Sequence, residues 1–349
     1  MTMKRWLYWA MFFAFLIVIN FYRLDSYIMQ PGSAYDVSEF IEVKDAKPYE
    51  GTLNLMTIAQ RQATPVTYAW ALMSSTQEIL DVGRVRHPDE DEDEYEMRQQ
   101  KLMQDSQANA IISAFRYLNK PVEEKFKGVY LVQVVKNGAA DGKLQAGDQL
   151  TAIDRKPITS MDMLQTYLKP KQLGDEVKVT YERDGAEHTT TILLQKIPGD
   201  KAQRIGLGVS FMESLEVVTE PDVKVEAGAI GGPSAGLMFT LGIINALSAD
   251  DITKGYQVAG TGTIDAEGNV GRIGGAKQKV IAADHDGMEI FFALDAPLEP
   301  EYKKAFPDAV TNYEEAVATA KKIKTDMKIV PVQTLQDAID YLAQLPHKK

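Results

Sequence analysis

A serine in a turn rich in glycine and proline is the residue whose surroundings most suggest chemistry. The stretch GGPSAGLMFTLGIINAL, residues 231–247, sets Ser234 just before an apolar helix. One interpretation is structural, because a serine hydroxyl at a helix start accepts a hydrogen bond from a free first-turn N–H. The other is chemical. Gly232 and Pro233 would shape a turn that presents Ser234 as a nucleophile, with backbone N–H groups around it to hold an oxyanion.

A serine hydroxyl is a poor nucleophile at neutral pH and needs a base. Histidine is the usual base, but none of the four histidines has a partner acid in a supporting motif: His87, His188, His285 and His347. The sequence also lacks a Gly-x-Ser-x-Gly elbow. A Ser-His-Asp hydrolase is therefore a poor fit.

Lysine can serve as the base if its amine is neutral. The pKa of a free lysine, about 10.4, must fall to roughly 7 to 8, which requires burial without a carboxylate partner. In the helical stretch AKQKVIAADHDG, Lys277 shares a face with Val280 and Ile281. Lys279 lies roughly 200° around the helix from Lys277. This pattern favours Lys277 as the buried amine, against the ordinary alternative of a surface lysine.

The elements that would position these residues alternate between strands and helices over 203–349, which indicates an α/β or α+β domain. A strand is also expected over 51–60, where GTLNLMTIAQ alternates. No stretch matches G-x-x-x-x-G-K-[ST], so no ATPase motor is expected on this sequence.

Residues 121–197 read as a compact β-rich module. Short apolar runs separated by turns predict strands, and a short helical run falls between the second and third of them. The expected strands are 128–135, 149–154, 176–183 and 188–194, with the helix over 160–168.

Composition excludes several function classes. With 349 residues, two or three domains are expected. The net charge of −11 argues against non-specific nucleic-acid binding. The sequence has no cysteine, which excludes disulfides and thiolate metal sites. The acidic run HPDEDEDEYE, residues 87–96, lacks the glycine of a calcium loop, so we expect a solvated loop there, then a helix over 95–119. No metal and no cofactor are expected.

The first thirty residues predict a membrane anchor. Seventeen residues from Trp6 to Tyr22 are almost entirely apolar and follow Lys4 and Arg5. As a helix they would be about 26 Å long, near the lower limit for crossing a bilayer. A cleaved signal peptide is the alternative, but the nearest small-residue site, 32–34, lies far beyond the apolar run. We therefore expect a single-pass membrane protein whose remaining chain is extracytoplasmic.

Two parts of the sequence carry family resemblances. The sequence GPSAG, with the lysine of IGGAKQK 43 positions after its serine, resembles the Ser-Lys dyad of the Lon protease family. The intervening AGTGTIDAEGNVGRIGG fits the same pattern. The resemblance, over about 205–349, implies that Ser234 is the nucleophile, Lys277 the general base and Thr261 a group that orients the amine. Gly231 departs from ATP-dependent Lon enzymes, which often have an acid three residues before the serine.

The segment GKLQAGDQLTAIDRKPI resembles a PDZ domain, which binds extended peptide ends by adding them as a strand. The resemblance places the groove between the 129–135 strand and the 161–168 helix. It places the carboxylate-binding loop near Gly128, Val129 and Tyr130.

Together these features resemble the membrane-anchored Lon-like proteases of Gram-positive bacteria. The expected fold is α+β, with an inserted β-rich PDZ domain and an N-terminal transmembrane helix. The expected boundaries are 1–30 for the head and anchor, 31–120 for a segment that adds a strand to the protease domain, 121–197 for the PDZ domain and 198–349 for the proteolytic domain.

The function that this resemblance implies is an ATP-independent serine endopeptidase acting on peptides or flexible protein segments, with a hexameric ring as the implied assembly. One alternative is a non-catalytic PDZ membrane scaffold with a protease-like domain. A Ser-His-Asp protease of the PDZ-bearing HtrA type is a second alternative, against which the missing Gly-Asn-Ser-Gly-Gly turn argues.

Overall fold

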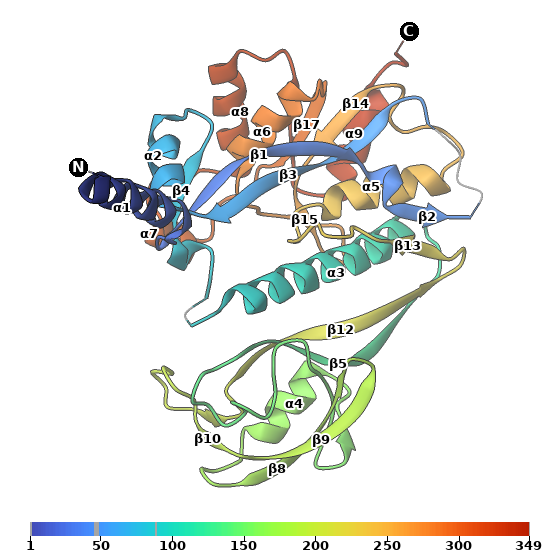
Figure 1. Cartoon of the computed structure of the whole chain (residues 1–349). Helices are drawn as coiled ribbons and strands as arrows, with labels where there is room; N and C mark the ends of the chain where they lie inside the picture. Colours follow the sequence, from blue (N-terminus) through green and yellow to red (C-terminus); the bar gives the residue numbers. More distant parts are fainter. Residues whose placement is uncertain (1, 45–48, 88, 349) are drawn as a thin grey trace.

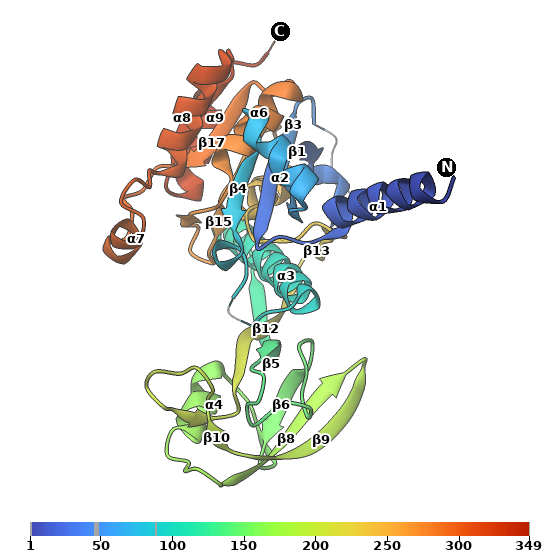
Figure 2. The same cartoon turned by 60° about the vertical axis from the view of Figure 1, so that its left-hand side comes forward.

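A computed structural model of the chain describes residues 2–44, 49–87 and 89–348, without the side chains of residues 2–5. It has a larger α/β body and a smaller β-rich module, joined by a long two-stranded ribbon (Figure 1). A long helix, α3 (Glu92–Tyr117), lies between the two (Figures 1 and 2). The chain therefore leaves the larger body and returns to it, as expected of an inserted module.

The larger body is built on a six-stranded sheet with the order β18-β17-β14-β3-β1-β4. Strands β3, β14, β17 and β18 pair in parallel, whereas β1 runs antiparallel to both β3 and β4. The bounds are β1 (Ser26–Asp36), β3 (Thr52–Gln62), β4 (Glu78–Asp81), β14 (Gln257–Gly260), β17 (Ile290–Leu294) and β18 (Lys328–Val332). The strand predicted over 51–60 is thus central to this sheet, as the resemblance implied.

Alternation along the strands gives the sheet an apolar core on each face. Leu53 and Leu55 of β3 join the core formed with α3, α5 (Gly236–Leu247) and α9 (Leu335–Gln344). Met56 joins the opposite core, with α6 (Ala276–His285) and α8 (Asn312–Ile323). Helices α5 and α6 therefore lie on opposite faces of one sheet, and this arrangement positions the site.

The β-rich module has its own sheet, with the order β12-β5-β6-β8-β9 and β7 paired to β6. The predicted strands and helix are all found, but the sheet also includes a strand beyond residue 197, the expected end of the module. The bounds are β5 (Val122–Val134), β6 (Gln149–Ile153), β7 (Lys156–Pro157), α4 (Met161–Leu168), β8 (Glu176–Arg183), β9 (Ala186–Leu193) and β12 (Val209–Thr219). Strands β5 and β12 form the connecting ribbon, paired from Val122↔Thr219 to Val134↔Val209.

The acidic run is not wholly a solvated loop. Asp91 caps α3, which begins at Glu92, so the acids after it occupy the first turn of a helix, where the macrodipole favours negative charge. Glu90 is buried and pairs with Arg98 at 2.6 Å. The charged run therefore starts a helix, three residues earlier than the apolar spacing alone indicates.

The N-terminal helix α1 (Thr2–Phe21) projects from the larger body beside α2 (Pro65–Met73) (Figure 2). Within the residues that the structure describes, no helix combines the length and the apolarity needed to cross a membrane. The predicted transmembrane span is therefore not confirmed.

Short elements complete the described chain. They are η1 (Val37–Glu39), β2 (Ile41–Val43), η2 (Val82–Arg84), β10 (Gln195–Lys196), β11 (Ile205–Gly206), β13 (Val223–Val225), β15 (Thr263–Ile264), β16 (Val270–Gly271) and α7 (Pro300–Ala305).

Candidate active site

The turn before α5 does not use Ser234 as a helix cap. Helix α5 begins at Gly236 with Ala235 in the capping position, and no side chain caps it. The interpretation of Ser234 as a helix cap is therefore wrong, and its hydroxyl is not used to cap α5. Gly232 has a φ of +86°, a conformation that glycine adopts without strain and that turns the chain sharply two residues before the serine.

Hydrogen bonds from two sides fix this nucleophile turn, residues 231–234. On one side, the Gly232 N–H donates to the Gln99 carbonyl at 2.9 Å. The Ser106 hydroxyl donates to the Pro233 carbonyl, also at 2.9 Å. On the other side, the Gly262 N–H donates to the Ser234 carbonyl at 3.0 Å. The backbone of the turn is therefore held while the serine side chain is left to face the cleft.

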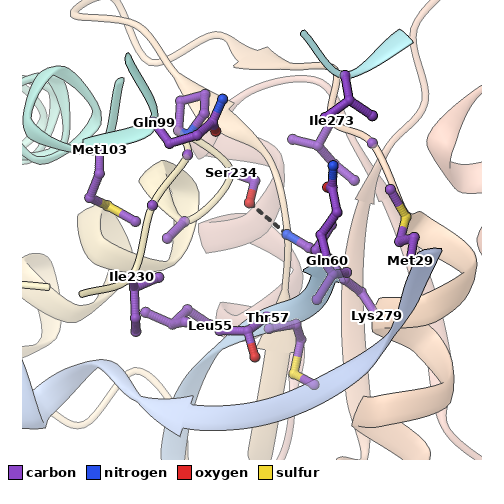
Figure 3. A pocket seen from close by; sticks show the side chains of 18 of the residues that line it. Met29, Leu55, Thr57, Gln60, Gln99, Met103, Ile230, Ser234, Ile273 and Lys279 are labelled. Atoms are coloured by element: carbon purple, nitrogen blue, oxygen red, sulfur yellow. Dashed lines mark hydrogen bonds between the residues drawn. The ribbon is translucent and has the colours of Figure 1, made fainter. Parts of the chain in front are cut away.

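The partner of the serine comes from the opposite face of the sheet. Lys279 Nζ on α6 lies 2.6 Å from Ser234 Oγ (Figure 3). The same nitrogen lies 2.9 Å from Thr261 Oγ1. Thr261 follows the carboxyl end of β14, a parallel strand. The carboxyl ends of parallel strands are where residues from the two faces of an open α/β sheet can meet.

The structure corrects the choice of lysine. Lys277 is only partly buried, and its backbone N–H donates a hydrogen bond to Glu315 Oε1 at 3.4 Å. The buried side of α6 includes Ala276, Lys279 and Ala283, at helical spacing. The prediction gave weight to the bulky Val280 and Ile281. Val280 is buried, but Ile281, which lies on the same face as Lys277, is only partly buried, so that face of α6 is not the buried one.

The backbone approaches the sheet closely at the start of α6, at Gly275. Gly275 has a φ of +73°, and a Cβ there would lie 2.9 Å from Sδ of Met29 on β1. Glycine is the residue that permits this contact. The first turn of α6 can therefore sit against strands β1 and β3, which brings Lys279 within reach of the nucleophile turn.

Burial gives this lysine unusual acid–base behaviour. Lys279 is 2% exposed, and desolvation by burial lowers the pKa of its amine to about 7. A charged ammonium loses its hydration in such a place, and its partners among the described residues are the hydroxyl oxygens of Ser234 and Thr261. A large share of the amine is therefore neutral at pH 7, as a general base requires.

Thr261 lies where the resemblance placed it. It is fully buried, accepts a hydrogen bond from Lys279 and donates its own to the Ser234 carbonyl at 3.2 Å. The hydroxyl therefore holds both the amine and the nucleophile turn, which fixes the lysine side chain in one direction.

The dyad opens into a cleft of about 580 Å³. Leu55, Met103 and Ile230 lie on one side of the Ser234–Lys279 pair, and Met29 and Ile273 on the other (Figure 3). The charged residues that line the cleft, besides the lysine, are Arg84 and Arg272. Such a cleft suits an extended chain with apolar side chains near the serine.

None of the four histidines is among the described residues that line this cleft. His188 stacks on Tyr181, and the ring of His285 is bonded to Asp286. The structure therefore gives no support to a Ser-His-Asp arrangement. Among the residues described, no group of three or more His, Cys, Asp or Glu side chains is placed to hold a metal ion.

The structure also corrects the predicted groove of the β-rich module. Gly128, Val129 and Tyr130 pair with β12 on one side, and Val129 and Tyr130 pair with β6 on the other. Both edges of β5 are thus occupied there, and a peptide has no room to add as a strand. Strand β12 lies at the end of the sheet order and follows the Gly208 turn, where φ is +71°. The outer edge of β12 is therefore the edge that can accept a strand.

Comparison with protein families divides the chain in the same way. Residues 200–344 match the Lon protease (S16) C-terminal proteolytic domain, and residues 101–194 match a PDZ domain.

The chain is also similar to curated Lon proteases and to a solved PDZ domain. The chain is 26% identical over 342 residues to a Lon protease of Metamycoplasma arthritidis, covering 91% of this chain and 36% of that protein. It is 29% identical over 170 residues to a Lon protease of Mesomycoplasma hyopneumoniae, covering 48% and 17%. The solved PDZ domain of the SdrC-like protein from Listeria monocytogenes is 31% identical, with a TM-score of 0.23, covering 25% of this chain and 90% of that one. The chain therefore spans well under half the length of these Lon relatives.

Proposed function

Because this chain carries a PDZ domain and the C-terminal proteolytic domain of the Lon protease family, we propose that it is a serine endopeptidase with a Ser234–Lys279 dyad. The observation that carries the proposal is the 2.6 Å contact between the serine hydroxyl and a buried amine with a pKa of about 7. The lysine differs from the one expected from the sequence, but the reaction is the same.

The geometry supports acyl transfer in two steps. Neutral Lys279 takes the proton of Ser234 as Oγ attacks the scissile carbonyl carbon, and an oxyanion forms. The lysine then returns the proton to the leaving amine as the C–N bond breaks and the acyl-enzyme remains. In the second step, the amine takes a proton from water, whose oxygen attacks the ester, and returns it to Ser234 Oγ. Both steps balance without a cofactor.

In this proposal the nucleophile turn itself stabilises the oxyanion. The Gly232 N–H is bonded to Gln99, so it points away from the reacting carbonyl. The N–H groups of Ser234 and Ala235 are the backbone donors next to the hydroxyl. We assign the oxyanion site to them, since fixed donors in a site shielded from water stabilise developing charge most.

Substrate choice follows from what the chain carries. We propose that cleavage is independent of ATP, because no Walker sequence occurs on this chain and the cleft suits an extended segment. Peptides and flexible segments are then the expected substrates. The PDZ domain would capture them on the outer edge of β12. A homo-oligomeric ring remains an expectation from the family, which sedimentation of the purified chain would test.

We further propose that α1 attaches the chain to a membrane, with both domains on the extracytoplasmic side. Exposed apolar side chains support this: Trp6 and Phe21 of α1 are 73% and 74% exposed, and Trp70 and Met73 of α2 are 63% and 78% exposed. The two helices emerge at one end of the sheet, since the Leu24 N–H bonds the Ala63 carbonyl at 2.9 Å.

Cell fractionation tests the attachment. The full chain should sediment with membranes, and a chain lacking residues 2–22 should be released while keeping its peptidase activity. Equal partition of both chains between membrane and soluble fractions would contradict the attachment. It would leave the proposal of the Ser234–Lys279 dyad unaffected.

A serine-directed fluorophosphonate and a quenched fluorescent peptide mixture test the peptidase. The wild-type chain should be labelled once per protomer and should hydrolyse peptides, whereas Ser234→Ala should do neither. Removal of a serine nucleophile costs up to about 10⁶-fold in turnover. Hydrolysis by Ser234→Ala at the wild-type rate would exclude the assignment. An unlabelled, inactive wild type would favour the non-catalytic scaffold.

A further inference from the structure

Helix α3 contacts two different parts of the molecule through two of its faces. Glu94, Met97, Lys101 and Asp105 fall on one stripe, and Gln99, Met103 and Ser106 on another. At 100° per residue the two stripes are roughly 160° apart around the helix. The helix lies between the larger body and the PDZ module, so each stripe meets a different part of the molecule (Figure 1).

The first stripe contacts the PDZ module. Glu94 Oε1 accepts a hydrogen bond from the N–H of Val134, the last residue of β5, at 3.2 Å. A Cβ at Gly147 would lie 3.5 Å from Sδ of Met97, which places the thioether against that turn. These contacts involve the two ends of the first loop of the module.

The second stripe contacts the nucleophile turn. The Gln99 carbonyl accepts the Gly232 N–H, and the Ser106 hydroxyl donates to the Pro233 carbonyl, each at 2.9 Å. A Cβ at Gly231 would lie 3.0 Å from Cβ of Gln99, so the turn packs directly on the helix. A small shift of α3 therefore moves the backbone that carries Ser234.

We propose that α3 is a positioning element through which the PDZ module sets the geometry of the Ser234 turn. The module then affects the rate of bond cleavage as well as the capture of substrate. The physical link is short: Val209 of β12 pairs with Val134 of β5, whose N–H bonds Glu94 five residues before Gln99. A peptide strand added to the outer edge of β12 would act on Val209, the first residue in this series of contacts.

The effect on rate rests on the proposed peptidase function, but the mechanical coupling does not. The test therefore has two readouts on the full-length chain. One is hydrolysis of a quenched fluorescent peptide mixture. The other is hydrogen–deuterium exchange in the segment 229–237, which includes the Gly232 N–H bonded to Gln99. The second readout needs no activity.

Glu94→Ala and Met97→Ala each remove one contact between α3 and the module. Each should lower kcat about 3- to 10-fold, since small displacements of reacting groups cost up to about 100-fold. KM should stay within about twofold, and the pH midpoint should not move, because neither residue touches Lys279. Exchange in 229–237 should become several-fold faster. Glu96→Ala is the matched control, because Glu96 is an exposed acid on the same helix.

Two features separate positioning from simple destabilisation. Glu94→Gln keeps an acceptor oxygen for the Val134 N–H and should recover most of the lost kcat. Met97→Ala leaves the Asp91–Glu94 capping box of α3 intact, so it covers the case in which Glu94→Ala fails to fold. Exchange in 229–237 that is unchanged in both folded alanine variants would overturn the coupling. A wild-type chain without hydrolysis would overturn the peptidase function, and exchange alone would then decide the coupling.

Discussion

Two buried lysines on different helices, Lys279 of α6 and Lys101 of α3, have opposite surroundings. Lys279 is 2% exposed and Lys101 is 4% exposed, so burial does not distinguish them. Lys101 forms an ion pair with Asp105 on the next turn of α3, whereas Lys279 is bonded to the hydroxyls of Ser234 and Thr261. Desolvation disfavours a buried ammonium, and a carboxylate restores it. The partner, and not the depth, decides which lysine can act as a base.

The largest effect is expected from removing the unpaired amine. Lys279→Met should reduce kcat by at least about 10⁴-fold, as loss of a base does in other serine peptidases. The variant should fold, and its Tm at pH 7 should rise by on the order of 5 °C, because a polar group that costs free energy to bury is gone. Stopped assays measure kcat, and thermal unfolding measures Tm.

Lys277→Met is the matched control for this prediction. Lys277 is the same residue type, lies on the same helix and is partly exposed. Its kcat should remain within about twofold of wild type. If Lys277→Met lost most of its kcat and Lys279→Met remained active, the general base would be Lys277.

The second prediction gives Lys279 the kind of partner that Lys101 has. Thr261→Asp puts a carboxylate beside the amine and should raise its pKa, so that the charged form dominates at pH 7. We expect about a 100-fold loss of kcat/KM at pH 7, with partial recovery at pH 9. Thr261→Asn, similar in size and neutral, separates charge from shape. Equal pH profiles of the two variants would contradict the argument.

The third prediction concerns pH. With a pKa of about 7, Lys279 is protonated at lower pH, so kcat/KM should fall about tenfold for each pH unit below that value and level off above it. The linked stability has the same sign. Between about pH 7 and 10.5 the unfolded chain holds the extra proton, so the free energy of unfolding rises with pH in that window. A flat rate profile from pH 5.5 to 8.5 would exclude a lysine base.

The smallest effect is expected at the paired lysine. Lys101→Met leaves Asp105 partly buried without its cation, and burial already raises the pKa of that carboxyl. Chemical denaturation should show a loss of about 1 to 3 kcal/mol. Lys101→Met with Asp105→Leu should recover most of this loss, because both charges are then gone. A double variant as unstable as the single one would show that the pair contributes packing and not charge.

Much of the fold could be predicted from local patterns. The strands of the PDZ module and the apolar helix after Ser234 have short, regular periods that a single sequence displays. The start of α3 was predicted late, at residue 95, because acids in a first turn resemble a solvated charge run until the cap at Asp91 is recognised. The ribbon strand β12 was not assigned to the module, because its partner β5 lies far away in the sequence.

The sequence by itself predicted the kind of chemistry, because a serine in a glycine-rich turn and a lysine-bearing helix are recognised from residue type and short spacing. Thr261 was added only by the family resemblance. Only the tertiary structure decided which lysine is buried and which strand edge is open. Both depend on what packs against each face, here β1, β3 and α8 against α6 and the β12 strand beside β5. Burial and pairing are properties of neighbours in space, which spacing along one chain does not specify.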